Sequence, residues 1–248
     1  MIGEQLAMRI KAVLFDLGGT LVDTPSDFDY ENLLVPLHQS LVKNGVVVPF
    51  DEYRKVHVGI RDRIWSEDSL KEVAFASIIC EALGRLGYSF QFTDKLILDA
   101  TEAFMEPWIQ ARTMEEDVPS VLGRLKERFK VGVVSNFSCS SAVWKTLERF
   151  GVLTFFDVVV VSVDVGWRKP SSRIFQAALR ELGVSASETV FVGDELDHDV
   201  EGAKKVGMYA VWLRRPSSIE TVGRIKADGT IGKLEELFSV LRRFELAE

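Results

Sequence analysis

Cysteine is scarce in this chain of 248 residues, which contains only Cys80 and Cys139. The two lie far apart in unlike contexts, so the sequence has neither a disulfide framework nor the cysteine spacing of a zinc site. Long apolar runs are also missing: no stretch is long enough to cross a membrane, and the N-terminal residues lack the apolar region of a signal peptide. We therefore expect a cytoplasmic protein with reduced thiols and no membrane partner.

An excess of basic residues is absent as well. The formal net charge is −7 and no block of lysine or arginine occurs, so the composition does not indicate a nucleic-acid partner. A content of 47% hydrophobic and 27% charged residues is typical of a globular protein. The length allows one large α/β domain or a core with an inserted second domain. An acidic protein that handles a phosphorylated substrate needs local cations or a metal ion to offset its own field.

The segment Lys11–Thr24 organises the rest of the chain. Its apolar run Ala12–Phe15 is followed by Asp16 and then by Gly18-Gly19-Thr20. This pattern predicts a buried strand that ends in a tight loop, with the carboxylate at the strand tip. Parallel α/β sheets bind ligands at that edge, and glycine N–H groups can face an anion, so the loop is a candidate phosphate site.

A helical block is expected between Asp23 and about Met114, because no convincing strand occurs there. Four segments have apolar residues at helical spacing: Phe28–Lys43, Asp51–Trp65, Leu70–Leu86 and Thr93–Ile109. Ser69 and Glu72 match a capping box for the third segment. The expected core of the block includes Leu34, Leu37, Leu41, Ile78, Leu83 and Leu86.

Strands and helices alternate beyond Asp117. The expected strands are Lys130–Ser135, Phe156–Val165, Thr189–Val192, Tyr209–Leu213 and a short one near Gly229–Ile231. The expected helices span residues 118–129, 140–150, 171–182, 200–206 and 232–244. This alternation predicts an α/β fold with a parallel sheet wrapped by helices. The first strand belongs to that sheet, so the helical block is an insertion that projects over the carboxyl edge.

Polar residues end several of these strands, far apart in sequence but expected at one edge: Asp16, Ser135 with Asn136, the loop carrying Lys169, and Asp194 with Asp199. Converging carboxylates repel one another unless a cation lies among them, and oxygen ligands of this kind suit Mg²⁺. The Asp16 carboxylate can attack phosphorus to form an aspartyl-phosphate. Lys169, the Ser135 hydroxyl and the Asn136 N–H are suited to the phosphoryl oxygens.

Four motifs together resemble those of the haloacid-dehalogenase-like hydrolase superfamily: DLGGT at Asp16–Thr20, VVSN at Val133–Asn136, RKPSSRIF at Arg168–Phe175 and GDELDHD at Gly193–Asp199. The resemblance implies a three-layer α/β/α, doubly wound, Rossmann-like sheet of residues 8–23 and 115–248. It also implies that residues 24–114 form that family's helical cap of the first type.

The resemblance further implies Asp16 as the nucleophile and Lys169 as the residue that stabilises the charge of the transferring group. Gly18, Gly19, Ser135 and Asn136 would bind that group. Mg²⁺ would be held by Asp16, the backbone carbonyl of Gly18, Asp194 and, directly or through water, Asp199.

Gly18 departs from the pattern of the family's phosphatases, which normally have a second aspartate at this position. That aspartate protonates the leaving alkoxide and later activates water, and glycine can do neither. General acid–base catalysis typically contributes about 10²–10⁴-fold, so a site that lacks it is expected to be slow by that order.

Three functions are weighed. The first is a Mg²⁺-dependent phosphatase for a small phosphorylated metabolite, and the second is a 2-haloacid dehalogenase, whose halide needs no proton. The retained Asp194 and Asp199 favour phosphoryl chemistry. The third is a slow or silent family member with a binding role.

Substrate choice is expected to lie with the helical block, where Arg54, His57, Arg61 and Arg63 are candidates on one helix. Trp167 is either a lid aromatic or a packing residue. His38 and His198 are expected at the surface, although His198 lies within the fourth motif. Whether the protein is a monomer or a homodimer stays open.

Overall fold

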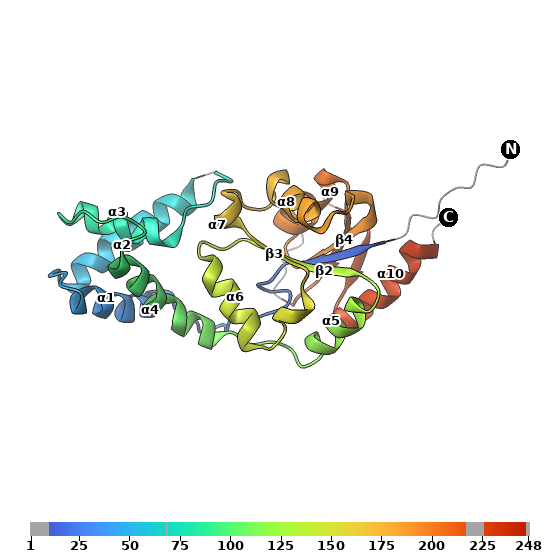
Figure 1. Ribbon diagram of the computed structural model, residues 1–248, viewed down its shortest axis with the longest axis horizontal. Helices are drawn as coiled ribbons and strands as arrows, with labels where there is room; N and C mark the ends of the chain where they lie inside the picture. The colour runs from blue at the N-terminus through green and yellow to red at the C-terminus, as the bar shows by residue number, and fades with distance from the viewer. Residues whose placement is uncertain (1–9, 68, 217–225, 247–248) are drawn as a thin grey trace.

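A parallel sheet lies at the centre of the fold (Figure 1). The computed structural model describes residues 10–67, 69–216 and 226–246. The sheet has six strands in the order β3-β2-β1-β4-β5-β6, and each neighbouring pair is parallel. The strands are β1 (Ala12–Phe15), β2 (Lys130–Ser135), β3 (Val158–Val161), β4 (Thr189–Gly193), β5 (Tyr209–Leu213) and β6 (Gly229–Ile231). The α/β class expected from the sequence is confirmed.

Helices cover both faces of the sheet and give it three layers. One face packs against α5 (Val118–Lys126), α6 (Ser140–Arg149) and α10 (Leu237–Leu246), and the other against α8 (Ser172–Leu182) and α9 (Glu201–Val206). In β1, Val13 and Phe15 point to the first face while Ala12 and Leu14 point to the second. Because both faces are covered, the strands are mostly apolar, and the polar residues of β2 and β4 lie at the strand ends.

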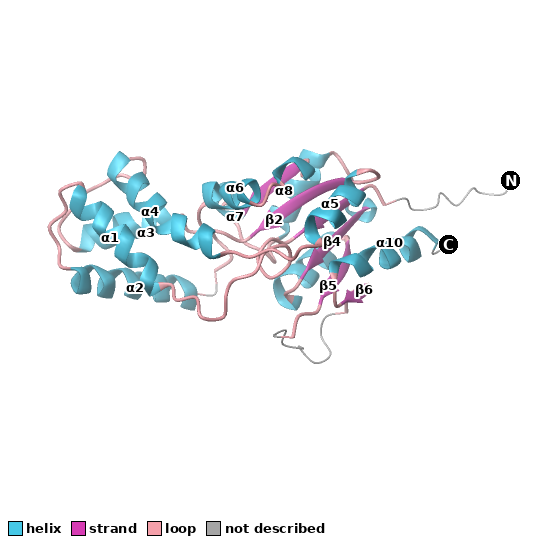
Figure 2. Cartoon of the chain, turned by 90° about the horizontal axis from the view of Figure 1, so that it is seen from below, coloured by secondary structure: helices cyan, strands magenta, loops and turns pink. Residues whose placement is uncertain are grey.

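The inserted helices pack around an apolar core of their own and lie beyond one end of the sheet (Figures 1 and 2). They are α1 (Leu34–Lys43), α2 (Phe50–Ser66), α3 (Phe75–Arg85) and α4 (Lys95–Ala111). The expected core residues of this block are buried, with Leu86 partly so. Where the chain leaves and re-enters the sheet region, Asp23 and Thr113 exchange two backbone hydrogen bonds, of 2.9 and 3.2 Å.

Several expected elements are shorter than the sequence suggested, among them α1, which begins at Leu34 and not at Phe28, and α5, which ends at Lys126. For two others the contacts show the reason. The third helix begins at Phe75 and not at Leu70, because Glu72 forms no capping box with Ser69; its carboxylate accepts a hydrogen bond from the Ser162 hydroxyl of the sheet region instead (2.5 Å). The strand expected over Phe156–Val165 ends at Val161. Ser162 starts a helical turn, α7 (Ser162–Val165), and its hydroxyl oxygen accepts the Phe137 N–H (2.8 Å).

Parts of the expected sheet region, namely residues 8, 9, 217–225, 247 and 248, lie outside the described residues. Short helical turns complete the described chain at residues 31–33, 153–155, 186–188, 196–200 and 234–236. None of the described helices combines the length and apolar character that crossing a membrane requires.

Candidate active site

Three of the expected site residues lie at the carboxyl ends of neighbouring strands. Asp16 follows β1, Ser135 ends β2 and Asp194 follows β4, and β1 pairs with both of the other strands. The Asp16 N–H donates to the Val192 carbonyl at 2.9 Å, which fixes the Asp16 backbone beside β4. Successive strands are added on opposite sides of β1, and α/β sheets bind their ligands at this kind of position.

Lys169 places a buried positive charge among these carboxylates. Its ammonium group donates to Asp16 Oδ1 and, at 2.7 Å, to Asp199 Oδ1. The exposed fractions are 2% for Lys169, 6% for Asp16 and 1% for Asp199. Burial acts to lower the pKa of Lys169, but the attraction of the two carboxylates outweighs it and raises that pKa above its usual value. The lysine is therefore charged at neutral pH.

Asn136 holds the loop that carries Lys169. The Lys169 N–H donates to Asn136 Oδ1 at 2.7 Å, and Asn136 Nδ2 donates to the Lys169 carbonyl at 3.2 Å. The asparagine side chain thus positions the lysine, a role that the sequence alone did not indicate. Its backbone remains at the tip of β2, where the sequence placed an N–H donor.

Glycines at two positions allow the carboxylates to approach the backbone. A Cβ atom at Gly193 would lie 2.3 Å from an oxygen of Asp199. At Gly19, where φ is +81°, it would lie 2.3 Å from an oxygen of Asp194. Gly18 differs from both, because a Cβ atom there meets no atom within 4 Å. The space for a side chain at Gly18 is present, and only the side chain is missing.

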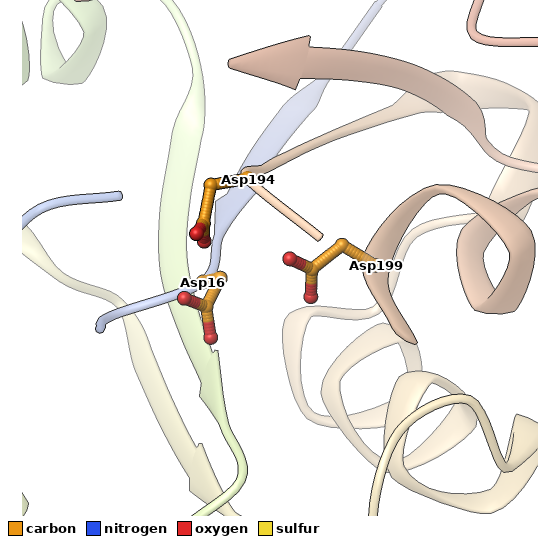
Figure 3. A group of neighbouring side chains, drawn as sticks. All are labelled: Asp16, Asp194 and Asp199. Atoms are coloured by element: carbon orange, nitrogen blue, oxygen red, sulfur yellow. The ribbon is translucent and has the colours of Figure 1, made fainter. Parts of the chain in front are cut away.

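Asp16, Asp194 and Asp199 form a cluster of the kind that binds metal ions, with one carboxylate oxygen of each within 4.8 Å of the others (Figure 3). Burial, opposed by Lys169 but reinforced by Asp199 and Asp194, raises the pKa of Asp16 to about 8. Burial and the nearby Asp199 and Glu195 raise the pKa of Asp194 to about 6. The Lys169 ammonium group contacts only Asp16 and Asp199 of these three carboxylates, and a divalent cation among the three would relieve the excess of negative charge.

Hydrogen bonds distinguish the three carboxylates. Both oxygens of Asp199 have partners, Lys169 Nζ and the Glu195 N–H, the second at 3.0 Å. Oδ1 of Asp16 accepts from Lys169, whereas Oδ2 of Asp16 accepts no hydrogen bond within the described residues. Asp16 therefore retains an oxygen that can attack a substrate or bind a cation, whereas Asp199 is already engaged.

Asp194 is positioned by two residues that the sequence analysis missed. The Thr20 hydroxyl donates to Asp194 Oδ1 at 3.1 Å, and Trp212 Nε1 donates to the Asp194 backbone carbonyl at 2.9 Å. Thr20 lies within the first motif, and this position was a signal from which its role at the site could have been predicted. Trp212 is one apolar residue within β5, and nothing in the local sequence distinguishes it.

Two cavities meet at this edge of the sheet. The smaller, of about 140 Å³, is lined by Asp16, Gly18, Ser135 and Lys169 together with Arg112 at the end of α4. The larger, of about 610 Å³, extends between the sheet region and the helical block. Residues that line both include Trp108, Asn136, Phe137 and Lys169.

The candidate residues of the helical block separate into different roles. Arg61 lines the larger cavity, with its guanidinium carbon 4.8 Å from the centre of the Tyr30 ring. Arg54 pairs with Glu31 and Arg63 with Glu81, both outside the cavity lining. His57 is fully buried between two tyrosines and does not reach the cavity, because its ring nitrogens lie 3.1 Å from the Tyr30 and Tyr53 hydroxyls.

The remaining candidates lie near the surface. His38 is half-buried, with Nε2 2.8 Å from the Val48 carbonyl oxygen. Trp167 packs under the Arg173 guanidinium, whose carbon is 4.1 Å from the ring centre. His198 is exposed, lines the larger cavity and pairs with Glu195 at 2.7 Å, which raises the His198 pKa.

A family model of haloacid dehalogenase-like hydrolases matches residues 10–207. The chain belongs to this family. The hydrolase is 32% identical to a glyceraldehyde 3-phosphate phosphatase of Methanopyrus kandleri over 207 residues, which cover 83% of this chain and 84% of that protein.

Solved structures of proteins with these activities have the same fold. An HAD phosphatase from Thermococcus onnurineus aligns with a TM-score of 0.64 and 28% identity, over 94% of the hydrolase and 98% of that chain. A 2-haloacid dehalogenase from Pseudomonas syringae pv. Tomato DC3000 aligns with a TM-score of 0.68 and 28% identity, over 95% and 99%. The fold is therefore shared by phosphatases and dehalogenases, and the site residues must decide between them.

Proposed function

We propose that this hydrolase is a Mg²⁺-dependent phosphatase that cleaves a small phosphorylated metabolite through an aspartyl-phosphate on Asp16. The observation that carries the proposal is the cluster of Asp16, Asp194 and Asp199, in which the Lys169 ammonium group contacts Asp16 and Asp199. A haloacid is an anion, and acids placed beside it would repel it. A phosphoryl group bound together with a divalent cation is attracted to the same cluster.

Different residues of the site carry out the two steps of phosphate ester hydrolysis. An oxygen of Asp16 attacks phosphorus, the ester P–O bond breaks, and its electron pair stays on the leaving oxygen. Lys169, Ser135 and the backbone N–H of Asn136 stabilise the phosphoryl oxygens. The Gly19 N–H, which the sequence placed in the same role, donates to the Val22 carbonyl at 2.7 Å instead. Water then attacks the aspartyl-phosphate, which releases inorganic phosphate and restores the Asp16 carboxylate.

The carboxylate donor set fits Mg²⁺, which prefers hard oxygen ligands and keeps several of its waters. Asp16, the Gly18 carbonyl and Asp194 would hold the ion, and Asp199, whose oxygens are both hydrogen-bonded, would act through water. When bound, the ion would neutralise charge on the phosphoryl group.

Glyceraldehyde 3-phosphate is the first substrate to test, because several archaeal relatives at 26–32% identity are named for it. A second candidate is a phosphate ester with an aromatic group, such as a nucleoside 5′-monophosphate. The larger cavity supports it, since about 610 Å³ lined by Tyr30, Trp65, Trp108 and other rings exceeds the needs of a triose phosphate.

Residues 24–114 are proposed to act as a cap that covers the site and selects the substrate. Their helices supply most of the aromatic lining of the larger cavity, and the paired crossings at Asp23 and Thr113 would serve as the hinge. A cytoplasmic location is proposed because Cys80 and Cys139 are both free thiols.

A panel assay tests the function. Chromogenic phosphate, glyceraldehyde 3-phosphate, phosphoglycolate, nucleoside monophosphates and 2-chloropropionate are each incubated with Mg²⁺ or with a chelator. We expect phosphate release that chelation abolishes. Chloride release that resists the chelator would favour the dehalogenase instead, and no turnover of any compound would favour the slow or silent member with a binding role.

A further inference from the structure

Arg112 is a buried cation that the reaction described above does not use. It follows the last residue of α4, directly before the paired crossing at Thr113. The residue is 6% exposed, and its guanidinium carbon lies 3.8 Å from the centre of a Trp108 ring and 5.2 Å from that of Phe28. Its backbone carbonyl accepts a hydrogen bond from Arg149 at 3.0 Å. The backbone contact thus holds the Arg112 main chain, and the two rings hold the guanidinium group over them.

No carboxylate neutralises the charge of Arg112 within the described part of the chain, and its buried Nε has no hydrogen-bond partner there. Burial lowers the pKa of Arg112 to about 10, which leaves it protonated at neutral pH. Buried charges are normally paired, because an unpaired one is costly to desolvate. The guanidinium group is therefore available to an anion that enters from outside.

The cavity that Arg112 lines is the one that contains Asp16. It measures about 140 Å³, and Gly18 and Lys169 also line it. At about 30 Å³ per water molecule, a phosphoryl group with its ester oxygen occupies much of such a space. Lys169 already contacts Asp16 and Asp199, so Arg112 is the cation of this lining that has no carboxylate partner in the described chain.

The geometry of substitution at phosphorus decides which substrate atom Arg112 meets. The attacking and leaving oxygens lie roughly in line across phosphorus. Asp16 and Lys169 belong to the sheet side of the cavity, whereas Arg112 and Trp108 belong to the α4 side. A phosphoryl group attacked by Asp16 therefore directs its leaving oxygen toward α4.

We propose that Arg112 is a catalytic residue that stabilises the negative charge developing on the leaving oxygen, in partial replacement of the acid missing at Gly18. The proposal rests on the proposed phosphatase function. As the Asp16–phosphorus bond forms and the ester bond breaks, guanidinium N–H groups donate to the leaving oxygen. A water molecule then protonates this oxygen, and the hydroxide ion that remains is consumed when the aspartyl-phosphate is hydrolysed. Arginine does not give up a proton, so the effect is electrostatic and grows with the basicity of the leaving oxygen.

The test is a series of substrates with uncharged leaving groups of rising pKa: p-nitrophenyl, phenyl and simple alkyl phosphates. Wild type and Arg112→Met are compared by kcat/KM in Mg²⁺, which reports the steps up to leaving-group departure. We expect Arg112→Met to lose about 10²-fold or more with the alkyl ester, as for removal of one oxyanion donor. With p-nitrophenyl phosphate the loss should be only a few-fold.

Arg61→Met is the matched control. Arg61 also stacks on an aromatic ring but lines only the larger cavity, so its effect should not depend on the leaving group. An equal loss for Arg112→Met across the series would mean that Arg112 binds the transferring phosphoryl group, and no loss anywhere would mean that it takes no part. Either result overturns the proposal. Failure of wild type to hydrolyse any member overturns the proposed function itself.

Two further variants keep the test decisive if Arg112→Met folds poorly. Arg112→Lys preserves the charge without the planar donors. Its loss of kcat/KM should also grow with the pKa of the leaving group, but less steeply than the loss caused by Arg112→Met. In the background of Gly18→Asp, the new acid protonates the leaving oxygen, so the loss caused by Arg112→Met with the alkyl ester should shrink about tenfold or more. An unchanged loss in that background contradicts the proposal.

Discussion

The two sides of the reaction pocket are built in opposite ways. On the sheet side, Asp16, Lys169 and Asp199 are joined by hydrogen bonds and almost fully buried. On the side of the helical block, Arg112 rests on the ring of Trp108 without a carboxylate partner in the described chain. The sheet side is thus a hydrogen-bonded network of charged groups, whereas the helical side consists of aromatic rings that contact cations.

This difference indicates a division of labour. A hydrogen-bonded network in a buried site holds charges at fixed positions, which is what stabilisation of a transition state requires. Stacking on aromatic rings stabilises a cation without dictating one partner, and it leaves N–H groups open to a ligand. Changes on the sheet side should therefore affect the attack on phosphorus. Changes on the helical side should affect the stabilisation of the leaving oxygen, through Arg112, and the choice of substrate, through the aromatic rings.

The largest effect is expected for Asp16→Asn. Loss of the nucleophile should lower kcat for a chromogenic phosphate ester by about 10⁴-fold or more, as for other covalent catalysts. Asp197→Asn is the matched control, because Asp197 is exposed in the fourth motif and lies outside the acidic cluster. If Asp16→Asn retained turnover, Asp16 would have no place in the mechanism.

Gly18→Asp should raise kcat for alkyl phosphates by about 10- to 100-fold, part of the usual range for general acid–base catalysis. The space at Gly18 is open, so the carboxyl group can be accommodated. Gly18→Asn has nearly the same shape without the acid and should bring no gain. Equal rates for the two variants, with the new carboxyl group shown to face the pocket, would mean that another group already supplies the proton.

Mg²⁺ affinity should fall about 10- to 100-fold in Asp194→Asn, measured by calorimetry against Asp197→Asn. In wild type it should also weaken as the pH falls from 8 toward 5. The pKa values of Asp16 and Asp194 are raised to about 8 and about 6, so below these values the ion must displace protons. An affinity independent of pH would remove these carboxylates from the ligand set.

Trp65→Ala tests the helical side. Trp65 lines the larger cavity and is 62% exposed, so its loss should leave the fold intact. We expect KM for a nucleoside monophosphate to rise about fivefold, equivalent to about 1 kcal/mol of stacking, with kcat unchanged. KM for glyceraldehyde 3-phosphate should not change. A fall in kcat for both substrates would contradict the assignment of the Trp65 ring to the choice of substrate.

The smallest effects are expected for glycine-to-alanine changes in one helix of each region, measured as changes in the free energy of unfolding by thermal denaturation. A Cβ atom at Gly202 of α9 would lie 2.4 Å from the Phe175 ring, so Gly202→Ala should cost about 1–3 kcal/mol. At Gly84 of α3 it meets nothing within 4 Å, so Gly84→Ala should stabilise by about 0.5–1 kcal/mol. Changes of the same sign would contradict the packing difference.

The parts of the fold that follow from short-range patterns could be predicted from the sequence. Val13 and Phe15 lie in a strand buried on both faces, which appears as an unbroken apolar run. Asp16 and Asp194 could be placed together because parallel strands share one carboxyl edge. The predicted end of β3 was wrong, because the strand end depends on the hydrogen bond between the Ser162 hydroxyl and the Phe137 N–H, which joins residues 25 positions apart.

The unpredicted parts of the site depend on long-range packing. In the sequence Arg112 is one basic residue at the end of a helix, a position where such residues are common for local reasons. Only the stacking on Trp108 and the cavity shared with Asp16 distinguish it. Glu72 likewise seemed to cap its own helix, whereas in the folded chain it contacts Ser162.

The central claim is that Asp16 becomes covalently phosphorylated, and trapping the intermediate tests it most directly. The enzyme is mixed with a chromogenic phosphate ester and Mg²⁺, quenched in acid within the first turnovers, digested, and sequenced by mass spectrometry. The account predicts one added phosphoryl group on the peptide that contains Asp16, with fragment ions that assign it to that residue, and none when a chelator is present. Turnover accompanied by a phosphoryl group on another residue, or by an unmodified Asp16 at every quench time, would contradict it.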